Sequence, residues 1–259
     1  MYSWKSVLIT IGLLFTLKIW FDYLHSTHSV QEYDSESGLP EIVLVDIDEK
    51  SVEEFGQLPF PRKIYADKLL ESHWSNTYVF TQVFSEPDRF GGDDEFATAL
   101  VNRLTVLASA PTIQTENGSS PFVGTSTLGG GDVKNAVWGT TGVLSPIPVL
   151  EGNTYGVGVT TATPSISGTP NFDGTIRSAP LLMQVDGDIY PSLAVEVLRA
   201  YTGEESYQLK VTDEVGVEWV RIGRQPPIAT TPQADLMISY WNKFKRYSFL
   251  CHSKIRIWY

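Results

Sequence analysis

The chain has 259 residues, of which 42% are hydrophobic and 19% are charged. This composition is typical of a globular protein and argues against a wholly disordered chain. The formal net charge of −11 repels phosphate backbones, so a nucleic-acid partner is excluded. The only cysteine, Cys251, leaves no intramolecular disulfide and no cysteine metal cage.

The segment Val7–Leu24 is apolar and, as a helix, would span roughly 27 Å, which is enough to cross a bilayer. A lysine precedes it, which favours a short cytoplasmic N-terminus at residues 1–6. No small-residue cleavage site follows, so we predict an uncleaved signal anchor in contact with membrane lipid. The alternative is an amphipathic helix packed on the globular part. The polar residues 25–40 are interpreted as a juxtamembrane linker.

The stretch Ile42–Arg62 begins with a run of four apolar residues, which is typical of a strand buried on both faces. Asp46 and Asp48 follow at alternating positions, so both carboxylates lie on one side of the strand's carboxyl end. Ligands of open α/β sheets usually bind at that edge. A helical segment follows at Glu49–Phe55, and Asp48 is equally suited to cap this helix.

A second strand is predicted from the sequence that follows. Lys63–Ser72 has helical spacing, and Thr77–Ser85 is rich in β-branched and aromatic residues. The resulting βαβ unit predicts that the two strands are parallel neighbours. Glu86 and Asp88 follow the second strand and would then lie near the aspartates that end the first. This acidic edge predicts a site for a ligand or a divalent ion, with solvated caps and turns as the alternative.

The remainder of the chain alternates between predicted strands, helices and loops. Residues 91–96 look like the signature of diguanylate cyclases but carry an extra Asp, so we interpret them as a helix start after a glycine turn. The predicted elements are, in chain order, a helix at Asp93–Arg103, a strand at Leu104–Ala110, a long loop at 111–152, a strand at Tyr155–Thr163, a strand at Thr175–Val185, a hairpin turn at Asp186–Gly187, a helix at Leu193–Tyr201 capped by Ser192 and closed by Gly203, and strands within Tyr207–Ile222 and at Leu236–Trp241.

These elements predict an α/β fold. We expect a mostly parallel central sheet with flanking helices and an antiparallel hairpin extension from Thr175 onward. One N-terminal transmembrane helix precedes this domain.

Separate motifs resemble the CHASE2 domain, an extracytoplasmic sensor domain of bacterial signalling proteins. The first is the Asp-x-Asp strand end with Ser51 and a Gly-x-x-Pro-x-Pro-Arg turn that ends at Arg62. A Phe-Ser-Glu-Pro segment follows the second strand, although Gln82 stands where the family carries an acidic residue. The second motif, within Asn171–Gly203, combines an Asp-Gly turn, a basic residue, a Pro-Leu strand and a Tyr-Pro-Ser-Leu helix start. An Arg-Tyr-Ser-Phe segment lies near residue 248, so we place the sensor domain at 41–249.

The resemblance implies a periplasmic sensor that detects an unknown small ligand or a partner protein. It implies neither enzymatic activity nor a cofactor. Arg62 and Arg177 would complement an anionic ligand or pair with the acids. The residues expected to bind the ligand are Asp46, Asp48, Arg62, Gln82, Glu86, Asp88 and Arg177.

The final residues, 250–259, form a tail too short to span a bilayer, so we expect a truncated module without an effector domain. Such a sensor would act through a separate membrane signalling protein, such as a cyclase or a kinase, or as a homo-oligomer. One alternative is a stand-alone periplasmic metal-dependent hydrolase that uses the acidic edge. Another is a truncated product without function.

Overall fold

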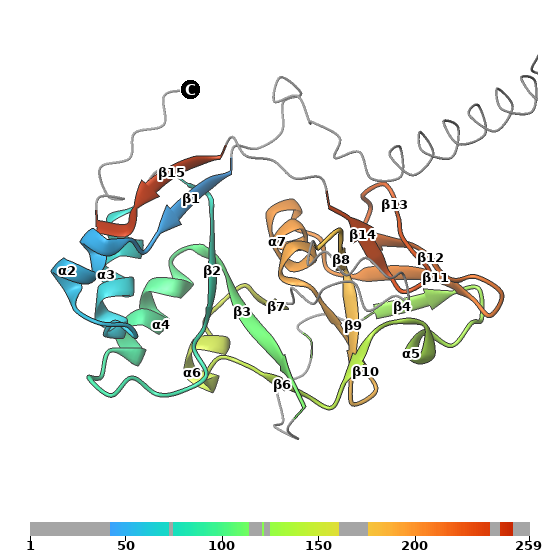
Figure 1. Ribbon diagram of the computed structural model, residues 1–259, viewed down its shortest axis with the longest axis horizontal. Coiled ribbons are helices and arrows are strands. Elements are labelled where there is room, and N and C mark those ends of the chain that lie inside the picture. Colours follow the sequence, from blue (N-terminus) through green and yellow to red (C-terminus); the bar gives the residue numbers. More distant parts are fainter. Residues whose placement is uncertain are drawn as a thin grey trace, which may run out of the picture. The chain divides into compact units, whose positions relative to one another are not determined.

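The structure is a computed structural model, which describes residues 42–72, 75–113, 121, 125–160, 176–238 and 244–250 (Figure 1). All of these residues belong to one compact unit of the chain. Among them, no helix is long and apolar enough to cross a membrane. The predicted span Val7–Leu24, the linker 25–40 and residues 251–259 of the tail lie outside the described residues.

Strands and helices alternate along the first part of the described chain. These elements are β1 (Val43–Asp46), α2 (Glu49–Phe55), α3 (Arg62–Glu71), β2 (Thr77–Val83), α4 (Asp93–Val101), β3 (Leu104–Thr112), β4 (Thr125–Leu128), α5 (Val133–Ala136), β5 (Gly139–Thr140), β6 (Gly142–Leu144), α6 (Pro148–Glu151) and β7 (Gly156–Val159). Strands dominate the second part, which comprises β8 (Ser178–Pro180), β9 (Leu182–Val185), β10 (Asp188–Pro191), α7 (Leu193–Thr202), β11 (Tyr207–Thr212), β12 (Gly216–Ile222), β13 (Ile228–Ala229), β14 (Asp235–Met237) and β15 (Lys245–Ser248).

Local signals account for the predicted helices, which form as α2, α3, α4 and α7. Asp48 caps α2, and Ser192 caps α7 by accepting a hydrogen bond from the Val195 N–H. Gly203 ends α7 in the left-handed conformation, with φ 69°. Helix α4 follows Gly92 and carries acidic residues in its first turn, which favour the helix dipole. The cyclase-like residues therefore form a helix start, as predicted.

The first described strand pairs with the last. β1 lies parallel to β15, with Val43 opposite Lys245 and Asp46 opposite Ser248. The prediction that β1 neighbours the strand at 77–85 is wrong, because β2 pairs in parallel with β3 and not with β1. The βαβ rule rests on adjacency in sequence, so it does not foresee a partner strand from the far end of the chain.

A parallel sheet lies at the centre of the first part. β3 has β2 and β7 as parallel partners, and β6 adds to it in an antiparallel orientation. α4 contacts β3 and also packs on α3 and α6, whereas α7 contacts β7, β3 and β2. α4 and α7 lie on opposite sides of these strands (Figure 1). This arrangement confirms parallel strands with flanking helices.

The remaining strands form separate small sheets, so the predicted antiparallel extension is not continuous with the central sheet. β12 lies antiparallel to β11 and β13, while β4 joins β11 in parallel. β9 pairs with β10 across the predicted hairpin, whose turn residues Asp186 and Gly187 have φ 45° and 96°. The predicted strand Thr175–Val185 divides into β8 and β9, and β8 pairs with β14. Short elements from β4 to α6 occupy part of the predicted loop at 111–152.

Two large hydrophobic clusters hold these elements together. The first is aromatic, and Phe60, Tyr65, Phe84 and Phe96 are each at most 3% exposed in it. Phe249, which follows β15, joins this cluster and stacks on Phe60 with ring centroids 6.1 Å apart.

The second cluster is mainly aliphatic and is built on the β11–β12 hairpin. Alternate residues of β11, namely Tyr207, Leu209 and Val211, face inward and are fully buried. Val220 and Ile222 of β12 and Val195 of α7 belong to the same cluster. Helix α7 therefore contributes to the second cluster, and it also contacts the central strands β2, β3 and β7.

Candidate functional site

Asp48 joins the start of the domain to its last strand. Its Oδ1 accepts hydrogen bonds from the Ser51 N–H at 3.0 Å and the Ser51 Oγ at 2.7 Å. The Ser248 Oγ, which lies 200 positions away on β15, donates to the same oxygen at 2.8 Å. The Ser51 and Ser248 hydroxyls hold the pKa of the Asp48 carboxyl below its usual value, because they favour the ionised form.

Ser51 is the buried centre of this contact. Its side chain is fully buried, and its Oγ accepts a hydrogen bond from the Leu250 N–H at 3.2 Å while it donates to Asp48. A carboxylate with a lowered pKa is a weak base, so it does not activate these hydroxyls as nucleophiles. The arrangement is therefore suited to holding two segments together. The predicted capping role of Asp48 is confirmed.

Asp46 makes a different contact on the same strand. Its carboxylate pairs with Arg246 of β15 at 3.3 Å, and the two side chains are 45% and 69% exposed. An exposed pair of this kind contributes little to stability, because water screens the charges. Asp46 is thus accessible to solvent, whereas Asp48 is engaged inside the β1–β15 contact.

Arg62 begins α3 and lies inside the domain. It is 7% exposed, and its backbone N–H donates to the Asp88 Oδ2 at 2.7 Å. The residue before it, Pro61, provides no side-chain cap. Asp88 therefore caps α3 from the loop after β2, which satisfies one of the free N–H groups of the first turn.

The Arg62 guanidinium is also engaged internally. It donates to the backbone carbonyl of Glu86 at 3.1 Å, pairs with Asp93 at 3.5 Å and lies over the Phe84 ring at 4.4 Å. The Asp93 Oδ2 in turn accepts the backbone N–H of Asp88 at 2.9 Å. Of the two roles predicted for this arginine, pairing with acids is the one that the structure shows.

The other predicted residues lie in separate places. Burial raises the pKa of the Tyr65 hydroxyl, and Gln82, which lies where the register of β2 with β3 shifts, partly offsets the rise. The backbone carbonyl of Arg177 accepts a hydrogen bond from the Ile238 N–H at 2.8 Å. Arg62, Glu86 and Asp88 are the predicted residues that meet at the start of α3.

The predicted meeting of Glu86 and Asp88 with Asp46 and Asp48 is wrong. Among the described residues, which include all four acids, no group of three or more His, Cys, Asp or Glu side chains is placed to hold a metal ion. The cause is the pairing of β1 with β15, which leaves β2 to pair with β3. The hydrolase considered from the sequence depended on this meeting of carboxylates.

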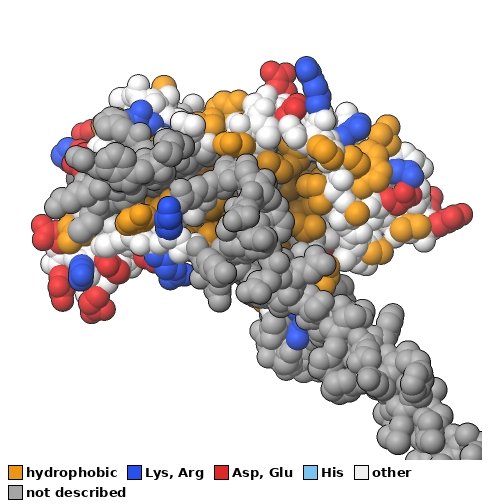
Figure 2. Space-filling view, turned by 90° about the horizontal axis from the view of Figure 1, so that it is seen from above, with side chains coloured by type: hydrophobic (Ala, Val, Ile, Leu, Met, Phe, Trp, Pro, Cys, Tyr) orange, Lys and Arg blue, Asp and Glu red, His pale blue; other side chains and the backbone are white. Residues whose placement is uncertain are grey.

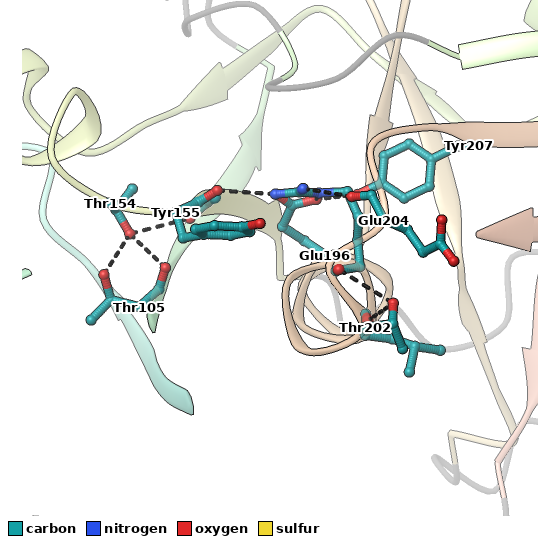
Figure 3. Close-up of polar contacts among 10 residues, drawn as sticks. Thr105, Thr154, Tyr155, Glu196, Thr202, Glu204 and Tyr207 are labelled. Carbon is teal, nitrogen blue, oxygen red and sulfur yellow. Dashed lines mark hydrogen bonds and ion pairs between the residues drawn. The ribbon is translucent and has the colours of Figure 1, made fainter. Parts of the chain in front are cut away.

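A buried charge network on α7 escaped the sequence analysis (Figure 3). Glu196 is fully buried and Arg199 is 4% exposed. The Arg199 Nε and Nη2 donate to the two carboxylate oxygens of Glu196 at 3.0 and 2.7 Å. The Tyr207 hydroxyl of β11 also donates to this carboxylate. The two carboxylate oxygens of Glu196 thus accept three hydrogen bonds from protein groups, so the buried charge is satisfied without water.

Arg199 extends this network to two neighbouring segments. It donates to the backbone carbonyls of Tyr155 and Glu204, each at 3.0 Å. A Cβ at Gly156 would overlap the Glu196 carboxylate, so only glycine allows β7 to approach so closely. The network therefore fixes α7 against β7 on one side and β11 on the other.

Burial and charge set the protonation of these groups. Burial raises the pKa of Tyr207, and the Glu196 carboxylate adds to the rise. Burial alone would lower the pKa of Arg199, but the hydrogen bonds and charge of Glu196 raise it overall. Glu196 and Arg199 lie three apart on α7 between the buried Val195 and Ala200. That helical spacing is the signal from which both charges could have been assigned to the buried face.

The family model of the CHASE2 domain matches residues 7–255, which is nearly the whole chain. No curated protein and no solved structure matches the chain.

Substitution of Asp48 by alanine is expected to lower the free energy of unfolding at pH 7. A carboxyl with a lowered folded-state pKa stabilises the protein above its unfolded pKa of about 3.9, and this contribution is lost as the pH falls through the folded pKa. The difference between the wild type and Asp48→Ala should therefore shrink below about pH 4. Urea unfolding of both proteins in detergent solution between pH 7 and pH 3 measures this difference in the free energy of unfolding. An Asp46→Ala variant with an equal loss at pH 7 would contradict the role given to Asp48.

Substitution of Tyr207 by phenylalanine is expected to destabilise the domain by about 1–3 kcal/mol, because the buried Glu196 carboxylate loses a donor. Tyr201→Phe is the matched control, because the Tyr201 side chain of α7 is 51% exposed. It should change stability by less than about 0.5 kcal/mol. Arg199→Met should cost more, about 3–5 kcal/mol, since it leaves a buried charge unpaired. Urea unfolding checks the series, and equal effects of the two tyrosine variants would show that the network does not stabilise the fold.

Proposed function

The chain belongs to the CHASE2 domain family, and from this membership we propose that it is a membrane-anchored extracytoplasmic sensor domain of bacterial signal transduction. CHASE2 domains are extracytoplasmic sensor domains, and the match over residues 7–255 is the observation that carries the proposal. The matched region includes Val7–Leu24, whose apolar sequence supports an anchor in the inner membrane.

The pairing of β1 with β15 supports a sensing role. β1 follows directly on the N-terminal segment, and β15 is the last described strand. A change inside the domain that alters one strand of this pair also alters the other, because backbone hydrogen bonds join them. The first and last described strands thus respond together.

We propose that an unknown small ligand contacts the exposed acids at one of two separate places, Asp46 at the end of β1 or Glu86 in the loop after β2. Asp46 and Glu86 present their side chains to solvent, so a ligand can reach them. Arg62, Asp88 and Asp48 hold the neighbouring backbone in place through their hydrogen bonds. Gln82 and Arg177 complete the proposed set.

Exposed hydrophobic side chains support a protein partner. Figure 2 shows such side chains gathered in the middle of one face, with acidic and basic groups toward its margins. Leu198 and Tyr201 of α7 and Leu236 and Met237 of β14 are between 38% and 57% exposed. Contiguous apolar surface is typical of interaction sites. We propose a membrane-bound cyclase or kinase, or a second copy of this chain, as the partner.

The topology is tested with single cysteines in a Cys251→Ser background. Val215→Cys lies in the exposed turn between β11 and β12, and its side chain should react with a membrane-impermeant maleimide in spheroplasts. Ser3→Cys should react only after lysis, because the predicted N-terminus is cytoplasmic. Both proteins should stay with the membrane after carbonate extraction. The reverse labelling pattern, or release by carbonate, would refute the anchored extracytoplasmic topology.

The partner is tested by purification from cross-linked membranes that contain two copies of the chain with different tags. Co-purification of the second tag is expected for a homo-oligomer, and recovery of a cyclase or a kinase is expected for a heterologous partner. A Leu198→Ser/Tyr201→Ser variant should lose the partner, whereas Val215→Ser, equally exposed but away from α7, should keep it. Recovery of neither partner with the wild type would contradict the proposal.

A further inference from the structure

We propose that residues 245–250, which comprise β15 and the turn after it, form a detachable clasp. In the open state the clasp leaves β1 while the rest of the domain stays folded. The opening follows from the geometry alone. Its use as the signalling step rests on the proposed sensing function.

The backbone pairing of the clasp is short and isolated. β1 and β15 have four residues each, and neither strand pairs with any other described strand. A two-stranded ribbon without a third strand is only marginally stable by itself. By contrast, β3 has described strands on both sides, and so has β11. Loss of the β1–β15 pairing therefore leaves the other sheets intact.

Hydrogen bonds with half-buried groups hold the clasp at residues 248–250. The Ser248 Oγ donates to Asp48 at 2.8 Å, and the Leu250 N–H donates to the Ser51 Oγ at 3.2 Å. Lys68 donates to the Leu250 carbonyl at 3.2 Å. At the other end, Arg246 forms an exposed pair with Asp46. The hydrogen bonds at residues 248–250 are thus the polar contacts that keep the clasp closed.

The apolar anchor of the clasp is one side chain. Phe249 is 7% exposed, and its ring lies 5.6 Å from that of Tyr65 and 6.1 Å from those of Phe55 and Phe60. These three residues lie outside the clasp. When the clasp detaches, Phe249 leaves their rings and exposes an aromatic socket formed by the three side chains. The core behind the socket does not depend on Phe249.

The aromatic cluster remains closed when the clasp leaves. Tyr65 contacts Phe84 at 5.4 Å and Phe96 at 5.9 Å, and Phe84 contacts Phe96 at 5.3 Å. Opening therefore removes one ring from the edge of a cluster whose centre keeps its own contacts. Proteins open in such local units at a lower free energy than global unfolding requires.

An equilibrium between closed and open clasp gives the domain two states. A ligand or partner that binds one state better shifts the populations toward it. Opening exposes the edge of β1 together with the aromatic socket, so it changes both the backbone and the apolar surface that the domain presents. This difference is what a regulated sensor requires.

Native-state hydrogen exchange on the full chain in detergent micelles tests the clasp. Amides of residues 245–248 should exchange at least about 10-fold faster than those in the centre of β3, through an opening that β3 does not share. Ser248→Ala removes the donor to Asp48 and the longer contacts of the same hydroxyl with Ser51 and the Leu250 N–H, so it should speed exchange in β15 by at least about 5-fold without changing β3. Arg246→Ala removes only the exposed pair on the same strand and is the matched control, with a change below about 2-fold.

A covalent lock provides the complementary measurement. Leu44 lies opposite Arg246 in the register, so Leu44→Cys/Arg246→Cys in the Cys251→Ser background should cross-link under oxidation. The locked clasp should exchange as slowly as β3. Leu44→Cys/Tyr247→Cys places the two thiols on opposite faces of the ribbon and should not cross-link.

Two results would overturn the proposal. One is equal exchange of β15 and β3 in the wild type, which would make the clasp part of the global folding unit. The other is a Ser248→Ala variant that accelerates β3 as much as β15. Failure of the topology or partner experiments would leave these exchange rates unchanged. The clasp and the proposed sensing function therefore fail separately.

Discussion

The contact between the first and last described strands is the constraint that closes the domain. β1 and β15 are held by their parallel backbone pairing and by Asp48, whose carboxylate accepts hydrogen bonds from Ser51 and Ser248. The same oxygen caps α2, so helix formation and closure of the chain share one group. Phe249 then reaches the aromatic cluster beside Phe60. The first part of the chain is in this way joined to residues about 200 positions later.

A second constraint lies at α7, where a buried ion pair and its hydrogen bonds join the helix to its neighbours. Glu196 and Arg199 are buried and satisfy each other, and Tyr207 adds a donor from β11. A buried pair of this kind gains little net stability over apolar packing, but it is costly to misalign. We infer that it fixes the orientation of α7 between β7 and the second hydrophobic cluster. Gly156 allows the close approach that this orientation needs.

The residues that carry the family resemblance are largely those that close the domain. Asp48 and Ser51 from the first motif meet Ser248 from the last, and Phe60 of the proline turn stacks on Phe249. These motifs therefore describe how CHASE2 domains fold more directly than what they bind. For recognition, the exposed positions of the surface are better candidates, because Asp48, Ser51 and Phe60 are engaged internally.

The sequence by itself determined the local structure and the family. Helix caps, the glycine helix ends and the Asp186–Gly187 turn depend on contacts within a few residues, so pattern and propensity were enough to place them. Only the tertiary structure decided which strands pair. It placed β15 beside β1, turned Arg62 inward and buried Glu196 with Arg199, because partners far apart in the chain are chosen by packing and hydrogen-bond satisfaction of the whole domain.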